Sequence, residues 1–119
     1  MLTACGPPAP SPDNGALLSA LRAGQRAEVT VNGAVAALEP DASGRHGPHQ
    51  RFLLTVAGTT VEVDHNLVLA PRVPLQVGEA VTVHGQFEPD PGHPVIHDTH
   101  HATGSHEGGW VDAAGQRYE

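Results

Sequence analysis

AEVTVNGAVAA, residues 27–37, is the stretch of the chain that decides the fold. Small apolar residues occupy every second position, and the polar residues Glu28, Thr30 and Asn32 stand between them. A period of two is typical of a β-strand that buries one face. Gly33, in the middle of the run, predicts a bulge or a tight coil, which a small barrel needs where its first strand turns from one sheet to the other. We therefore expect an all-β protein with a long first strand.

Further apolar runs, separated by turn residues, predict four more strands. We expect them at 51–56, 60–65, 80–87 and 95–101, with a polar loop at 39–50. The connection 66–79 contains Pro71 and Pro74, which are incompatible with a long helix or a central strand. Three strands, an irregular connection and a pair of strands occur in this order in an OB-like five-stranded barrel. An SH3-like or another small open barrel is the alternative.

The two ends of the chain differ from the barrel region in composition. Residues 1–15 contain four of the eleven prolines and few large apolar side chains. Such a segment buries too little surface to offset the entropy of ordering it. We therefore expect a disordered tether over 1–15 and a single domain over 16–119. After residue 101 we expect an irregular tail, apart from a hairpin near 112–115.

A short N-terminal helix is predicted by ALLSALRAG, residues 16–24. Its leucines fall on one side of a helix, and either Asp13 or Asn14 can cap its first turn. Gly24 suits the left-handed position that ends many helices. We expect this helix to cover one end of the barrel.

Length and charge exclude several classes of function. The chain has 119 residues and a net charge of −7, and its six basic residues are all arginines scattered along the sequence. Proteins that bind nucleic acids gather basic side chains on one face, so we do not expect a nucleic-acid partner. The sequence also has no run of 18 apolar residues, which a membrane-spanning helix would require.

Cys5 is the only cysteine in this sequence, which excludes an internal disulfide and a cysteine-based zinc site. Its surroundings, LTACG at residues 2–6, resemble a bacterial lipobox, in which the cysteine becomes the lipidated first residue of the mature protein. The motif predicts a lipoprotein of the periplasm or outer membrane, attached to the membrane only by its lipid anchor. The alternative is a cytoplasmic protein whose tail contains a cysteine by chance.

Histidine carries the main functional signal. The chain has nine histidines, and five of them lie between residues 93 and 106. Imidazole nitrogens are common ligands of zinc and copper. We expect His65, His97, His101 and His106 to line one polar site and to be the ligands of such an ion.

Strand geometry limits how these rings can meet. On a straight strand, His97 and His101 lie about 13 Å apart, which is too far for one ion. Either the chain bends near His100 or the ligands come from several elements. We exclude His84, because it falls on the outward face of its strand. The structural alternative is that the histidines only form hydrogen bonds.

Four other residues complete the expected binding site: Asn66, Arg72, His100 and Trp110. Arg72 stands between two prolines, so its guanidinium group could hold an anion, or form a salt bridge with one of the acidic residues. Trp110 is the only tryptophan, and we expect its ring to cover the core. Stacking of a bound ligand on this ring is the alternative.

Four motifs occur in order along the chain: DHNLVLAPRVP at 64–74, GQFE at 85–88, VIHDTHH at 95–101 and HEGGW at 106–110. Together they resemble a small bacterial family of uncharacterised domains, over about residues 27–118. The resemblance implies an OB-like barrel in exported proteins or lipoproteins, and it implies no reaction. In two places the chain departs from the family pattern. Asp98 stands where the family usually has tryptophan, and Ala102 stands where it usually has an acidic residue, which weakens a catalytic interpretation.

These observations favour an extracytoplasmic binding module with a polar site lined by histidines, for a small ligand or for a zinc or copper ion. A metal-assisted hydrolase, such as a phosphodiesterase, is the second hypothesis. There a bound ion would activate water, and Arg72 would stabilise the developing negative charge. An interaction domain with structural histidines is the third. The sequence predicts no oligomeric state.

Overall fold

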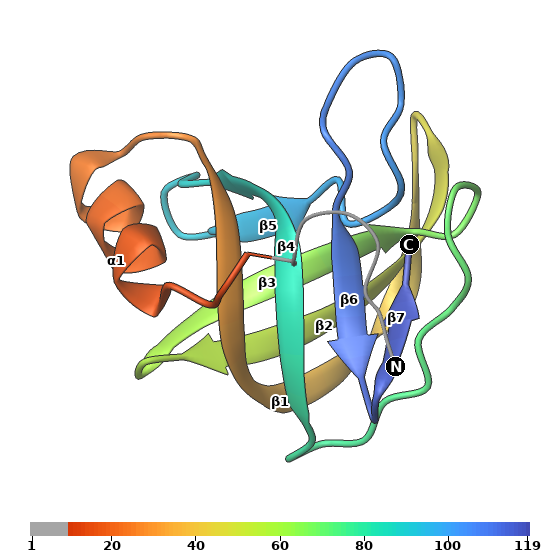
Figure 1. Cartoon of the computed structure of the whole chain (residues 1–119), viewed down its shortest axis with the longest axis horizontal. Coiled ribbons are helices and arrows are strands. Elements are labelled where there is room, and N and C mark those ends of the chain that lie inside the picture. Colours follow the sequence, from red (N-terminus) through yellow and green to blue (C-terminus); the bar gives the residue numbers. More distant parts are fainter. Residues whose placement is uncertain (1–9) are drawn as a thin grey trace, which may run out of the picture.

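The described part of the protein, residues 10–119 of a computed structural model, is built from one helix and one sheet of seven strands (Figure 1). The element bounds are α1 Asn14–Ala23, β1 Ala27–Gly44, β2 Gly47–Val56, β3 Thr59–Asn66, β4 Ala80–Glu88, β5 Val95–His97, β6 Trp110–Ala113 and β7 Gln116–Tyr118. The predicted all-β class is confirmed.

A double pairing of the long strand β1 closes the sheet into a barrel. Residues 27–34 of β1 pair with β4, and residues 34–44 pair with β2, both antiparallel. In Figure 1, β1 runs beside β4 and then curves round to run beside β2. Because β5 lies between β3 and β4, the ring β1-β2-β3-β5-β4 has no free edge. A small five-stranded barrel is therefore confirmed, and the narrower OB-like description stays a prediction.

Gly33 lies where β1 changes partner. A Cβ atom at this position would overlap the carbonyl oxygen of Thr55 in β2, so only glycine allows the two backbones to approach so closely. The register shifts shortly afterwards, between Val35 and Ala37. The expected bend of the first strand is therefore present, and its bulge lies just beyond the glycine.

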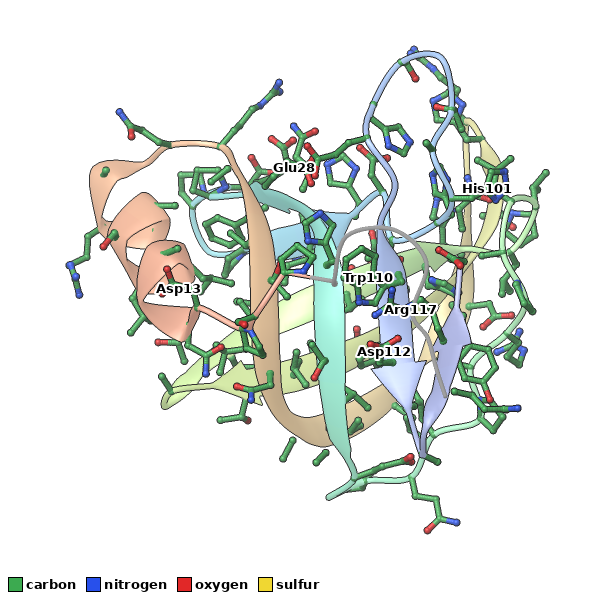
Figure 2. The ribbon with its side chains drawn as sticks, viewed as in Figure 1. Asp13, Glu28, His101, Trp110, Asp112 and Arg117 are labelled. Atoms are coloured by element: carbon green, nitrogen blue, oxygen red, sulfur yellow. The ribbon has the colours of Figure 1, made fainter. Side chains whose placement is uncertain are left out.

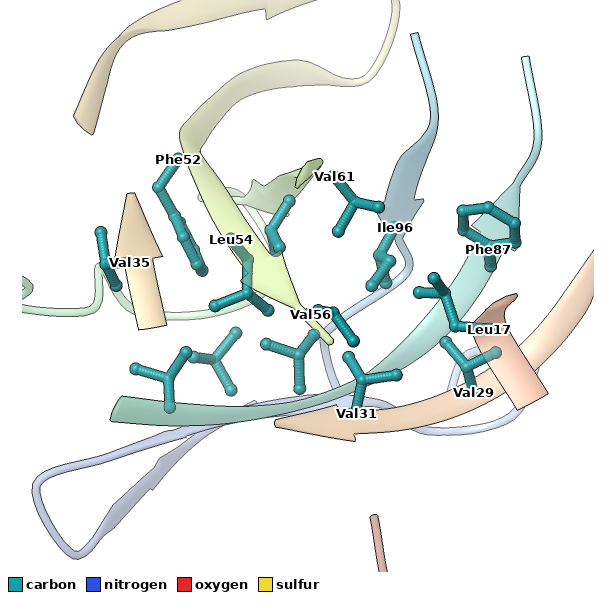
Figure 3. Packing of buried hydrophobic residues seen from close by; sticks show 14 of the residues in the cluster. Leu17, Val29, Val31, Val35, Phe52, Leu54, Val56, Val61, Phe87 and Ile96 are labelled. Atoms are coloured by element: carbon teal, nitrogen blue, oxygen red, sulfur yellow. The ribbon is translucent and has the colours of Figure 1, made fainter. Parts of the chain in front are cut away.

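The core fills the inside of the ring. Alternate residues of the strands point inward, and the fully buried side chains include Val31, Phe52, Leu54, Val63, Phe87 and Ile96. Helix α1 covers one end, where Leu17 is fully buried next to Val29 and Phe87 (Figure 3). Asp13 caps this helix by accepting a hydrogen bond from the backbone N–H of Ala16, and Gly24 ends it in the left-handed conformation, as predicted.

Three predicted element boundaries are wrong. The polar loop expected at 39–50 is a paired hairpin, because β1 and β2 continue to Gly44 and Gly47; a second register shift, between Glu39 and Ala42, accommodates Pro40. The fifth strand ends at His97 rather than near residue 101. The tail is more regular than expected, because β6 pairs with β4 and continues into β7 as a hairpin.

Three further predictions concern the proline-rich connection, the N-terminal segment and membrane-spanning helices. The connection 67–79 contains no strand or helix, as its prolines indicated. The lipobox at Cys5 lies outside the described residues, as does most of the expected tether, although Asn14 and Gly15 belong to α1. Within residues 10–119, no helix is both long enough and apolar enough to cross a bilayer.

Replacing Gly33 with alanine tests the closure of the ring. The added methyl group overlaps a backbone oxygen, which cannot rotate away as a side chain could. We expect Gly33→Ala to lower the free energy of unfolding by about 1–3 kcal/mol, as overpacking usually does. The control is Gly44→Ala in the same strand, where nothing lies within 4 Å of an added Cβ. Urea unfolding of both variants measures the difference, and equal midpoints would contradict the close approach of β1 and β2.

Candidate metal site

The segment between β5 and β6 builds the candidate site. β5 ends because Asp98 adopts a positive φ of 61°, a left-handed conformation that aspartate tolerates better than most residues. The turn breaks the alternation of the strand, so Thr99 and His100 are both buried although they are neighbours. The loop that follows returns to β6, held by a 2.7 Å hydrogen bond from the N–H of Gly109 to the carbonyl of His100 and by a bridge between Thr103 and His106.

Asp98, His100 and His106, here called the loop triad, bring three ligand atoms together. Oδ1 of Asp98 lies 3.8 Å from Nε2 of His100 and 3.7 Å from Nε2 of His106. The two rings meet edge to face, with 4.6 Å between their centroids. Around a tetrahedral zinc ion, neighbouring ligand atoms are about 3.4 Å apart. Small side-chain rotations would therefore bring all three atoms to bonding distance of one ion.

Hydrogen bonds orient both imidazole rings of the loop triad. Nδ1 of His100 donates to the carbonyl of His101 over 2.9 Å, and Nδ1 of His106 donates to the carbonyl of Glu107 over 2.5 Å. A carbonyl oxygen can only accept, so each Nδ1 carries a proton, and in the neutral ring each Nε2 keeps its lone pair. Metal-binding histidines are usually held in this way. Burial lowers the pKa of His100 and so favours its neutral ring. The hydrogen bond to the carbonyl of His101 acts in the opposite direction.

The loop triad faces a pocket of about 330 Å³. The rest of the lining is contributed by the β1–β2 hairpin, the segment after β3 and the loop itself: His46, Asn66, Val68, Leu69, Thr103 and Ser105. This volume accommodates a few water molecules or a small organic ligand. The pocket is thus a mixed polar and apolar space with the three candidate ligand atoms of the loop triad on one side.

His65 supports the loop triad from behind and is not part of it. The ring is fully buried; its Nε2 donates to the carbonyl of Pro71 over 2.9 Å, and its Nδ1 accepts from the hydroxyl of Thr99 over 2.7 Å. Both nitrogens are therefore occupied, which leaves none for a metal ion. The bond to Thr99 fixes the residue that lies between Asp98 and His100, so His65 positions the loop triad.

The four predicted metal ligands do not converge, and only His106 belongs to the loop triad. His97 is half-buried and lies beside the carboxylates of Glu88, at 3.0 Å, and Asp98, at 3.5 Å. His101 is exposed; its carbonyl accepts a hydrogen bond from His100, and its ring lies edge to face with that of His100, with centroids 5.9 Å apart. The left-handed turn at Asp98 separates the rings that a straight strand would have placed on one face.

The other predicted binding residues divide between two regions. His100 and Asn66 line the pocket, and Oδ1 of Asn66 accepts from the backbone N–H of Val68. Arg72 lines a different hollow and forms a two-fold hydrogen-bonded salt bridge with Asp41. The salt bridge was the structural alternative for Arg72, and Arg72 is not among the residues that line the pocket of the loop triad.

Trp110 covers the outside of the barrel wall rather than its interior. Its ring stacks on that of His84, with centroids 4.4 Å apart and planes 12° apart. On the β7 side, the guanidinium group of Arg117 lies 4.0 Å from the ring centroid, next to Asp112 (Figure 2). The ring is therefore held between two protein groups in the observed conformation.

His84, which the sequence prediction left out of the metal site, lies next to the loop triad. It does point outward from β4, but Trp110 and the loop cover it, and it is only 6% exposed. Its Nδ1 lies 2.7 Å from Oγ1 of Thr30, and its Nε2 lies 2.9 Å from Glu107 and 3.6 Å from Glu28. The two glycines before Trp110 could have indicated that the chain passes close to other backbone here. A Cβ at Gly109 would overlap backbone oxygens of β4 and of the loop.

Carboxylates and imidazole rings gather beside Glu28 on this face (Figure 2). Partial burial and the negative charges of Glu107 and Asp98 raise the pKa of Glu28, while the neighbouring histidines His84 and His106 oppose the rise. Mutual repulsion of these acidic groups is the condition that a bound cation relieves.

Comparison with known proteins identifies the family of this chain. A family model described as "Protein of unknown function (DUF3465)" matches residues 2–119. The chain belongs to this family. Membership agrees with the expected small uncharacterised family, and it assigns no ligand, reaction or location. No curated protein shows a significant match to the chain. The same is true of the solved structures.

The buried ring of His65 predicts how stability depends on pH. Burial lowers its pKa below the ordinary value of 6.5, the carbonyl of Pro71 opposes this, and the charges of His100 and His49 add to it. Below about pH 6.5 the unfolded chain therefore binds a proton that the folded chain does not, and the free energy of unfolding falls as the pH decreases.

Urea unfolding between pH 7.5 and 5.5, with a chelator present, measures this effect. We expect His65→Gln to be less stable than the natural chain at pH 7.5 and to lose less further stability as the pH falls. His46→Gln, which replaces an exposed histidine, is the control and should keep the natural slope. If His65→Gln also keeps that slope, the neutral buried ring is not the cause.

Proposed function

We propose that this protein is a small binding module that holds a divalent transition-metal ion, zinc or copper, in the loop triad. One observation carries the proposal: two imidazole rings, each fixed by a backbone carbonyl, turn their free Nε2 atoms towards the same carboxylate oxygen. Two nitrogens and one carboxylate oxygen form a donor set that zinc, copper and iron accept.

The proposed ion would have one side open. Three protein ligands leave at least one coordination position, and the pocket beside the loop triad provides room for water or a small ligand there. Asn66, Thr103 and Ser105 would offer hydrogen bonds to such a ligand. We propose ligand or metal binding rather than hydrolysis, because the only arginine assigned to the reaction is paired with Asp41 in another hollow.

We also propose that the module works outside the cytoplasm, attached by a lipid on Cys5. The support is the lipobox-like stretch LTACG at residues 2–6, followed by a segment rich in proline. An anchored module with a net charge of −7 would attract cations to its surface before they reach the site.

Calorimetric titration of the full chain without a histidine tag tests the metal proposal. We expect Zn²⁺ and Cu²⁺ to bind. Asp98→Asn or His106→Gln should weaken the binding of the ion by more than ~10–100-fold, which is the usual cost of losing a group that only supports a ligand. His101→Gln is the matched control, because it removes an adjacent exposed histidine that is outside the loop triad.

The control and the ligand variants separate the hypotheses. If Zn²⁺, Cu²⁺ and Fe²⁺ all fail to bind, or if Asp98→Asn and His106→Gln bind them as the natural chain does, the loop triad is not a metal site. The histidines would then be structural, and the interaction-domain hypothesis would replace the binding module.

A further inference from the structure

A second group of ligand atoms lies next to the loop triad, on the strands. Glu28 of β1, His84 of β4 and Glu107 of the loop, here called the strand triad, place one ligand atom each within 4.8 Å of the others. Nε2 of His84 is 2.9 Å from Oε2 of Glu107 and 3.6 Å from Oε2 of Glu28. These separations bracket the ~3.4 Å between neighbouring ligands of a tetrahedral ion.

His84 distinguishes the strand triad from a chance gathering of surface acids. The ring is almost completely buried between Thr30 on one neighbouring strand and Trp110 on the other. Thr30 and Trp110 are the direct cross-strand partners of His84, so the sheet register fixes the ring's position. Only its Nε2 edge meets the two carboxylates, and the chain thus supplies one rigid nitrogen ligand and two adjustable oxygen ligands.

The charges around the strand triad are not balanced by the protein. Arg26 pairs with Glu88, and Arg117 pairs with Asp112. Among the described residues, no arginine forms a salt bridge with Glu28, Glu107 or Asp98. Within residues 10–119, the ion-pair partners of these three carboxylates are therefore imidazole rings, which carry a positive charge only when protonated.

The two triads are adjacent and separate. Consecutive residues connect them, because His106 contributes its ring to the loop triad and Glu107 contributes its carboxylate to the strand triad. The backbone carbonyl of Glu107 also orients His106. A change confined to the Glu107 side chain therefore alters one triad and leaves the hydrogen bond that supports the other.

We propose that Glu28, His84 and Glu107 bind a second divalent cation, so that this face of the barrel holds a pair of ions. The oxygen-rich donor set favours a harder ion than the loop triad does, and zinc, manganese and copper all suit one imidazole with two carboxylates. The second site uses none of the side chains of the loop triad, so it stands or fails independently of the proposed function.

Titration with Cu²⁺ tests the second site, because copper binds such donors most tightly and quenches tryptophan fluorescence at short range. Trp110 is the only tryptophan and stacks on His84, so it reports the strand triad directly. We expect two equivalents of Cu²⁺ per natural chain by calorimetry, with strong quenching that a chelator reverses. The double variant Glu28→Gln/Glu107→Gln should bind one equivalent and lose most of the quenching.

Two further variants make the outcome decisive. Asp98→Asn/His106→Gln should bind one equivalent and keep the quenching, because the strand triad remains. Glu88→Gln is the matched control; it removes a neighbouring carboxylate that belongs to neither triad and should keep both equivalents. Binding of a single equivalent that does not quench Trp110 in the natural chain, or unchanged stoichiometry and quenching in Glu28→Gln/Glu107→Gln, would overturn the second site. Failure of the loop triad alone would instead appear as unchanged binding in Asp98→Asn/His106→Gln.

Discussion

Strand β1 uses its backbone hydrogen-bonding groups for two partners in succession, β4 and then β2, and the rest of the structure depends on that change. The change needs a sharp bend, and the bend needs Gly33, because any larger residue would meet the carbonyl of Thr55. Once β1 has closed the ring, the inward faces of its strands share one apolar core. The outward faces then become available for polar groups, and one of them carries both triads.

Close contact between backbones also produces the candidate site. At Gly85 and Gly109, β5 and the segment after it approach β4 so closely that a side chain at either position would meet main-chain atoms. The segment brings Glu107 onto the outward ring of His84, and Trp110 stacks on the same ring, so both rings are buried without lying in the core. His65 fixes the same segment from inside through Thr99. A small barrel can in this way bury polar rings on two sides of one wall.

The sequence predicted what depends on local pattern. The caps of α1, the alternation around Gly33 and the proline-rich connection are all properties of neighbouring residues, and the structure shows them where expected. The inward direction of His65 also followed from alternation. The membership of the triads could not be predicted in this way. It depends on a left-handed turn at Asp98, which an aspartate permits and does not require, and on the pairing of β6 with β4, which joins distant segments.

The hydrogen-bond partners of the imidazole rings give the two triads different chemistry. His100 and His106 donate to carbonyl oxygens, which accept only, so their neutral rings hold the tautomer with a lone pair on Nε2. His84 instead faces the hydroxyl of Thr30, which can either donate or accept. Without a cation, its Nε2 can donate to Glu107 while Thr30 donates to Nδ1. If a cation bound there, the proton of the neutral ring would have to lie on Nδ1, and the hydroxyl would turn to accept it. The loop triad would therefore meet an ion in the tautomer that its carbonyl partners already favour, whereas the strand triad would need one proton shift and one hydroxyl rotation.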